Sequence, residues 1–311
     1  MRQLSLFFIA AMFLIGSLFS ASCSITGVAE KFAPQTVLSA TTPGDAEVKK
    51  MLGIPSETPV DMIRWELTLT EEKTFLLGAV YGEAKPNTRG MIVENKLSFN
   101  GSYEITRGAA GDKIKEIYRL KSELPAARIS LVKVNDNLFH LLTAEDKLMI
   151  GNGGWSYTLN RKEPSADVSS LPVPSISNNE PALQTIFDGR TPCAEISQQF
   201  AIPVPEDCFK LKWRVTFNRD PKTFAPTTYT IQRIDHRPNL ITGKWTIEKG
   251  TGANAGAVIY KLDPAEPQKS LSFAAGDENV LFFLDKNGRL LVGDGEFSYT
   301  LNRHFPVKSG G

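Results

Sequence analysis

Apolar and polar residues alternate along several short segments of this chain. In 211–217 (LKWRVTF), apolar residues occupy every odd position and polar residues every even one. The segment 63–69 (IRWELTL) has the same pattern, and the segments 155–159 and 297–301 also alternate. A period of two directs successive side chains to opposite faces of a strand. The pattern therefore predicts β-strands that have one face on a core and the other in water.

The residues between these segments carry turn signals. The sequence DKNG at 285–288 separates the apolar runs 280–284 and 290–292, and Asn-Gly between such runs predicts a hairpin. Only 45–52 and 194–200 could form short helical turns. Many short strands favour a small barrel or sandwich, and barrel closure, which removes exposed sheet edges, favours the barrel.

One stretch of the sequence occurs twice. Residues 155–161 (WSYTLNR) reappear as 297–303 (FSYTLNR), an offset of 142 residues. The same offset relates two further pairs of segments, 101–103 with 243–245 and 117–120 with 259–262. Trp65 matches Trp213 at an offset of 148, so the first copy carries about six extra residues, which we expect within 82–94. The chain therefore contains two copies of one domain.

The two copies are long enough to bury their own cores, so we expect independent domains. The stretch between them is rich in Ser and Pro, which is typical of a linker. The predicted organisation is a signal peptide at 1–22, a tether at 23–45, a first barrel at 46–161, a linker at 162–182, a second barrel at 183–305 and a tail at 306–311.

The N-terminus has the features of an export signal. Arg2 is followed by an uncharged, apolar run of 16 residues, 4–19, and then by small residues that precede Cys23. The run is short for a membrane span, which needs about 20 residues. The small residues before Cys23 resemble a lipoprotein processing site, although Ser20 stands where a Leu is usual. The resemblance implies lipidation of Cys23; the alternative is an ordinary signal cleaved near Ser22.

Composition narrows the function classes. Without residues 1–22, which contain one charge, the chain has 34 basic and 34 acidic side chains. A balanced charge without a long basic run gives nucleic-acid binding no electrostatic support. If Cys23 is lipidated, Cys193 and Cys208 remain as a pair, and export would allow them to form a disulfide. Two buried free thiols are the alternative.

The motifs of the second copy occur in a characteristic order. The segment 189–195 (GRTPCAE) precedes an alternating strand, and 243–245 (GKW), 284–288 (LDKNG) and 299–301 (YTL) follow. This order resembles the N-terminal domain of the NlpE family of copper-resistance and envelope-stress lipoproteins, over most of residues 186–303. The resemblance implies a small lipocalin-like antiparallel barrel on a lipid tether.

The sequence departs from the family at its thiols. The family has a CxxC pair; Cys193 matches the first cysteine, but Ile196 stands in place of the second. The first copy, which resembles the family more weakly, has no cysteine in the corresponding region. The thiol pair linked with copper or redox sensing is therefore missing, and we expect no metal site and no cofactor.

No residue pattern points to catalysis, and no catalytic residue is predicted. His140, His236 and His304 do not stand at metal-ligand spacing, and His140 alternates within an apparent strand. The glycine-rich stretch 250–256 lies between two predicted strands, so it indicates a hairpin tip rather than a phosphate loop. The four tryptophans are expected to be core anchors, with a role in lining a ligand pocket as the alternative. They are Trp65, Trp155, Trp213 and Trp245.

These observations predict a non-enzymatic lipoprotein of NlpE type in the cell envelope, anchored through Cys23, on the outer membrane. We expect it to act in envelope sensing, stress response or interaction with an envelope protein. The alternative is a lipocalin-like carrier of a small apolar ligand within one barrel.

Overall fold

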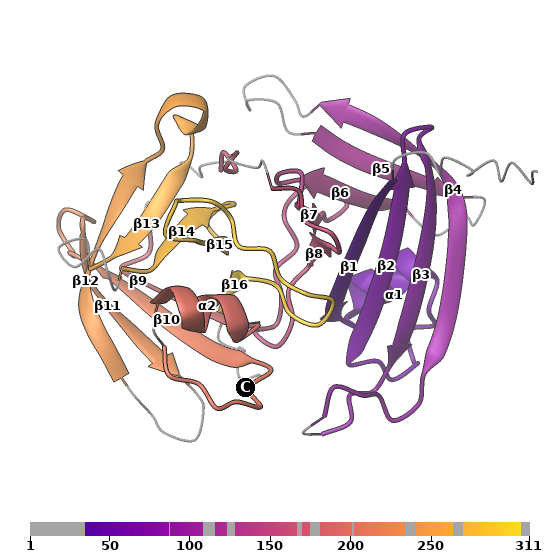
Figure 1. The fold of residues 1–311 in the computed structure, drawn as a ribbon, viewed down its shortest axis with the longest axis horizontal. Coiled ribbons are helices and arrows are strands. Elements are labelled where there is room, and N and C mark those ends of the chain that lie inside the picture. The colour runs from indigo at the N-terminus through magenta and orange to yellow at the C-terminus, as the bar shows by residue number, and fades with distance from the viewer. Residues whose placement is uncertain are drawn as a thin grey trace, which may run out of the picture. The chain divides into compact units, whose positions relative to one another are not determined.

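A computed structural model of the chain describes residues 35–86, 88–107, 116–122, 128–166, 170–174, 181–200, 202–233, 240–263 and 270–305. Within these residues the strands form two closed barrels of eight strands each, shown in Figure 1. Each strand pairs antiparallel with the next, and the last strand of each barrel pairs with its first. The prediction of an all-β chain with two tandem small antiparallel barrels is confirmed.

The two barrels have the same order of elements. The first contains β1 (Gln35–Pro43), β2 (Met62–Thr70), β3 (Thr74–Gly82), β4 (Asn95–Arg107), β5 (Glu116–Ser122), β6 (Ile129–Lys133), β7 (Leu138–Leu141) and β8 (Thr158–Arg161). The second contains β9 (Gln184–Thr191), β10 (Leu211–Arg219), β11 (Pro226–Arg233), β12 (Leu240–Lys249), β13 (Val258–Leu262), β14 (Ser272–Ala275), β15 (Val280–Leu284) and β16 (Thr300–Arg303). A helix follows the first strand of each barrel: α1 (Ala46–Leu52) and α2 (Ala194–Phe200).

The inward positions of the alternating strands form one hydrophobic core in each barrel. Trp65 is buried in the first core, and Trp213 and Trp245 are buried in the second. The indole N–H of Trp65 donates to Thr42 Oγ1 at 2.8 Å, and that of Trp213 donates to Thr191 Oγ1 at 2.9 Å. The same buried hydrogen bond is therefore present in both copies, and these three tryptophans are core residues as predicted.

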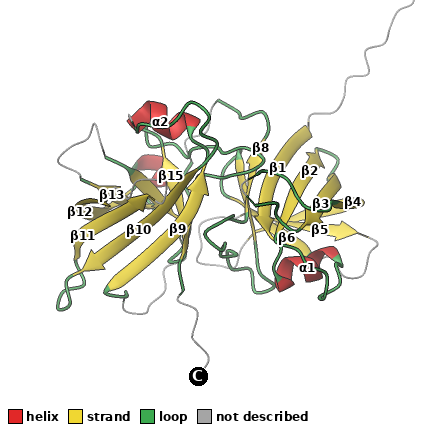
Figure 2. Cartoon of the chain, turned by 90° about the horizontal axis from the view of Figure 1, so that it is seen from below, coloured by secondary structure: helices red, strands yellow, loops and turns green. Residues whose placement is uncertain are grey.

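The two helices each close part of a core, and Figure 2 shows one beside each set of strands. Asp45 caps α1 by accepting the N–H of Val48 at 3.0 Å, and Gly53 ends the helix with a φ of 67°. The buried side chains of α1 belong to the first core and those of α2 to the second. The short helical turns predicted at 45–52 and 194–200 are confirmed.

The loops reproduce the repeat and its insertion. Between β3 and β4 lie the twelve residues 83–94, whereas between β11 and β12 lie only the six residues 234–239, as the change of offset predicts. The turn at 285–288 is confirmed by Gly288, which has a φ of 75°. Beyond this turn the pairing is only an isolated bridge between Leu284 and Leu290.

Two predictions about the elements are wrong. The first barrel begins at Gln35 with β1, within the predicted tether 23–45, and the boundary at residue 46 is corrected accordingly. Trp155 precedes β8 and is only half-buried, so it is not a core anchor; its ring lies under the guanidinium of Arg190, 5.4 Å from the Arg190 Cζ. The described residues of the predicted linker, which lies between β8 and β9, contain no helix or strand.

Candidate functional site

The two barrels contact each other through equivalent residues of the two copies. The N–H of Gly151 donates to Asn302 Oδ1, and the N–H of Gly293 donates to Asn160 Oδ1, both at 2.8 Å. Each residue and its equivalent are 142 positions apart, which is the repeat offset. The same contact is thus made once in each direction, as in an interface between two copies related by a two-fold axis. We call this contact, between 151–160 and 293–302, the junction.

At the centre of the junction, residues meet their own equivalents. Ser156 Oγ lies 2.5 Å from Ser298 Oγ, and Thr158 Oγ1 lies 2.9 Å from Thr300 Oγ1. All four side chains are buried, and both barrels belong to one compact unit, residues 33–311. The copies were expected to be independent domains; the buried junction instead joins them as a pair.

His140 lies on β7 against this centre and is fully buried. Its Nε2 donates to the carbonyl of Met149 at 2.8 Å, so its Nδ1, 2.9 Å from Thr158 Oγ1, is the acceptor in the neutral ring. Its ring meets the edge of Phe282, its equivalent in the second copy, with centroids 6.0 Å apart. Burial lowers the pKa of His140 from 6.5 to about 4, against the opposing effect of the Met149 hydrogen bond.

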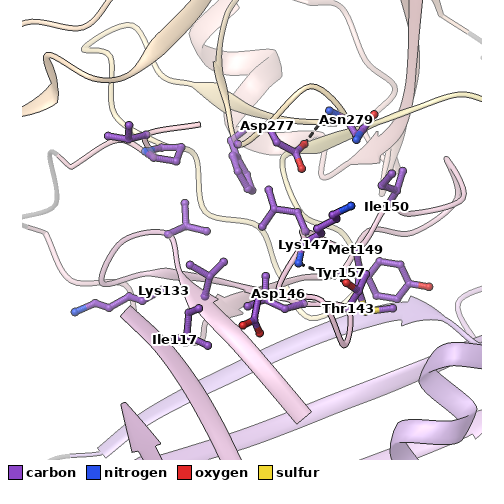
Figure 3. A pocket seen from close by; sticks show the side chains of 18 of the residues that line it. Ile117, Lys133, Thr143, Asp146, Lys147, Met149, Ile150, Tyr157, Asp277 and Asn279 are labelled. Atoms are coloured by element: carbon purple, nitrogen blue, oxygen red, sulfur yellow. Dashed lines mark hydrogen bonds between the residues drawn. The ribbon is translucent and has the colours of Figure 1, made fainter. Parts of the chain in front are cut away.

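A cleft of about 890 Å³ is lined by both barrels and by the linker residues 170–173. Figure 3 shows Asp277 and Asn279, from the turn before β15, across from Met149 and Ile150 of the first copy. The floor of the cleft is apolar. It is formed by Ile117, Val132, Leu142, Leu148 and Phe282. A concave apolar surface of this size is typical of a binding site.

The rim of the cleft is acidic. Two lysines line it, Lys133 and Lys147. The seven carboxylates that line it are Asp45, Glu47, Glu116, Asp136, Asp146, Asp277 and Glu278. Among the described residues, seven negative and two positive side chains give the lining a formal charge of −5, whereas the whole chain carries +1. The cleft therefore concentrates negative charge on a chain that is otherwise balanced.

Two of these carboxylates, Asp45 and Glu47, interact at the end of the cleft near α1. The hydroxyl of Tyr157 donates to Asp45 Oδ2, and burial, with Asp45, raises the pKa of Tyr157. Burial raises the pKa of Glu47, and the charges of Asp45 and Glu145 add to this effect. Negative charge is thus crowded beside a buried phenol, a setting in which a bound cation would be stabilised.

The predicted cysteine pair is confirmed. Cys193 and Cys208 form a disulfide that links the residue before α2 to the loop after it, with Cα atoms 6.1 Å apart. Ile196, which stands where the related family has its second cysteine, is fully buried in the second core. The disulfide therefore holds α2 against its barrel, and Ile196 fills the core beneath that helix.

The other candidate residues are dispersed. His304 is exposed, lies 3.0 Å from Asp188 Oδ2 and does not line the cleft. The stretch 250–256 lies in the turn between β12 and β13, as predicted. Cys23, the predicted signal peptide and His236 lie outside the described residues. Among the described residues, no three His, Cys, Asp or Glu side chains are grouped to hold a metal ion, and no helix could cross a membrane.

The cleft was missed in the sequence because its lining comes from distant segments. Its walls combine residues 116–117, 132–136, 142–150 and 276–279, which no local motif connects. No sequence signal indicated it, because Leu142 and Leu148, which flank the polar turn of the first copy, fit the ordinary hairpin pattern of apolar residues on either side of a turn.

The fold and the cleft together define an all-β protein made of two fused barrels with a cleft that both barrels line. No protein-family model, curated protein or solved structure was found to match the chain.

Proposed function

We propose that this chain is a lipid-anchored, non-enzymatic binding protein of the cell envelope, of NlpE type. Its two barrels act as a fixed pair, and a partner in the envelope binds in the cleft that both barrels line. In this proposal the lipid on Cys23 holds the pair at the outer membrane, and occupation of the cleft is the event that is sensed. A diacylated cysteine provides two hydrophobic chains, which are sufficient for stable attachment.

The observation that carries the proposal is the shared lining of the cleft. Phe282 of the second copy and Leu148 of the first contribute to one apolar floor, and Gly276 brings the two copies within contact distance, because a Cβ there would lie 2.8 Å from Leu148. A surface built from both copies exists only while the junction is intact. The duplication therefore has a functional consequence that a single barrel could not provide.

The packing of the second barrel disfavours the alternative function, which is carriage of a small apolar ligand within a barrel. Its interior is occupied by aromatic side chains: the ring centroids of Phe217 and Trp245 are 4.7 Å apart, as are those of Phe273 and Phe283. Trp213 contacts Phe283 as well, with centroids 5.3 Å apart. Small barrels can be filled in this way by their own side chains. We therefore place binding in the cleft.

The anchor is tested by replacing Cys23 with alanine in the full chain and separating membranes from soluble protein. We expect the variant to leave the membrane fraction and to lose incorporation of labelled palmitate. A matched control replaces Cys193 and Cys208 together, which should keep both the label and the membrane location. Full membrane retention of the Cys23→Ala protein would contradict the anchor.

Binding in the cleft is tested in cells by placing a photo-reactive phenylalanine analogue at Ile150, which lines the cleft. Leu76, on β3 and 53% exposed, is the control position outside the cleft. We expect a specific cross-linked product at Ile150 that does not form at Leu76. The same products from both positions, or none from Ile150, would contradict a partner in the cleft.

A further inference from the structure

Some carboxylates of the cleft rim form ion pairs with basic side chains of the first copy. Lys133 Nζ lies 2.6 Å from Asp136 and 3.7 Å from Glu116, and the guanidinium of Arg119 makes two hydrogen bonds to Asp146, at 2.8 and 2.9 Å. These pairs lie on the first copy. The acidic rim also includes Asp45 and Glu47 of the first copy and Asp277 and Glu278 of the second.

The acidic residues are distributed around an apolar floor and are not gathered at one point. They come from five separate parts of the chain, at 45–47, 116, 136, 146 and 277–278. A ligand that carried a single positive charge would approach few of them. A ligand with several cations separated by apolar groups could place the apolar groups on the floor and the cations along the rim.

The crowding at Glu47 adds a second reason for a cationic occupant. Burial and the nearby carboxylates of Asp45 and Glu145 raise the pKa of Glu47, because negative charges lie close together here. A positive group beside these carboxylates would relieve that repulsion. Complementary charge at a binding surface chiefly gives selectivity against ligands of the wrong sign.

We infer that the cleft binds a basic peptide segment in which aliphatic side chains alternate with lysine or arginine. This inference rests on the proposed function and specifies the partner that the cleft takes. The aliphatic side chains lie on the floor formed by Leu142, Leu148 and Phe282, and the cations lie along the rim, with Glu47 and Glu278 at the edges contributed by the first and second copies.

The test uses the lipid-free Cys23→Ala protein and fluorescence anisotropy with three labelled octapeptides. One alternates lysine and leucine, one alternates glutamate and leucine, and one alternates lysine and serine. We expect the lysine–leucine peptide to bind most tightly, and its affinity to fall with added salt. Glu47→Lys and Glu278→Lys, each at an exposed position, should weaken its binding roughly tenfold. Glu71→Lys, an exposed residue in the turn after β2, is the matched control and should leave the affinity unchanged.

Each outcome separates this inference from the broader proposal. Equal binding of the glutamate–leucine and lysine–leucine peptides would overturn the charge preference but leave an apolar binding cleft. If the lysine–serine peptide bound as tightly as the lysine–leucine peptide, the role of the apolar floor would be overturned. If Glu71→Lys weakened the binding as much as Glu47→Lys does, the charge effect would be non-specific. If none of the three peptides bound, the inference would be overturned. The cross-linking at Ile150 is independent of these results and decides the proposed function by itself.

Discussion

Acid should destabilise the folded protein through His140, and the size of the effect can be worked out from its surroundings. The ring is fully buried, and its neighbours Thr158, Thr300, Phe282 and the carbonyl of Met149 carry no charge that could stabilise a protonated imidazole. The pKa of His140 in the folded protein is accordingly lowered from 6.5 to about 4.

The direction of the pH dependence follows from which state binds the proton. Between pH 6.5 and 4 the unfolded chain protonates His140, whereas the folded protein does not. The free energy of unfolding therefore falls as the pH falls through this range, and the loss is complete near the folded pKa. Since one pKa unit corresponds to about 1.4 kcal/mol, His140 accounts for a loss of about 2 kcal/mol between pH 7 and pH 5, and of about 3 kcal/mol in full.

The assay is urea-induced unfolding of the native protein and of His140→Gln, each at pH 7 and pH 5. Glutamine retains a donor and an acceptor but does not titrate. The other ionisable groups are shared by both proteins, so their contributions cancel in the comparison. We expect the native protein to lose about 2 kcal/mol more than the variant between the two pH values. Equal losses would refute the argument, because they would mean that His140 is protonated as readily in the folded state as in the unfolded one.

Three further predictions concern single contacts. Replacing Cys193 and Cys208 by alanine should lower the free energy of unfolding by roughly 3 kcal/mol. In thermal unfolding, a reductant should lower the midpoint temperature of the native protein but not that of the variant. Asn160→Ala removes an acceptor and a donor to the facing loop of the junction, and should cost about 1–3 kcal/mol in urea unfolding; unchanged stability would mean that the junction contributes little. Thr42→Val and Thr191→Val each leave a buried indole N–H without its acceptor. Each should cost about 1–3 kcal/mol, and a loss in only one barrel would contradict the equivalence of the two.

The alternation of polar and apolar residues was sufficient to predict the strands whose outer faces meet water. The segments 63–69 and 211–217 lie within β2 and β10, where buried residues alternate with less buried ones. The constant repeat offset then predicted a second copy of the same barrel. The strand inference depends on solvent on one face of each sheet, which is the condition under which a period of two appears in the sequence.

The first strand was missed because that condition fails. The last six residues of β1, 38–43, are all buried, so the strand shows no alternation. Its inward side belongs to the barrel core, whereas its outward Thr41 donates to the carbonyl of Gly295 in the other copy, at 2.7 Å. The role of Trp155 as a core residue was predicted wrongly for a related reason, because its ring contacts Arg190 of the second copy and not the core of its own barrel. Contacts between copies leave no periodic trace in a single sequence.

The contact between His140 and Phe282, beside the centre of the junction, shows a consequence of the duplication. In a dimer of identical chains, a residue on the two-fold axis faces its own copy. Both sides of that contact are therefore the same residue, for example two histidines or two phenylalanines. Fusion of the copies into one gene removes that constraint, because each half can then mutate separately. His140 against Phe282 is such a mixed pair, 142 positions apart in one chain and in edge contact in space. The duplicated chain thus carries one titratable side chain at this position, without an identical charge opposite it.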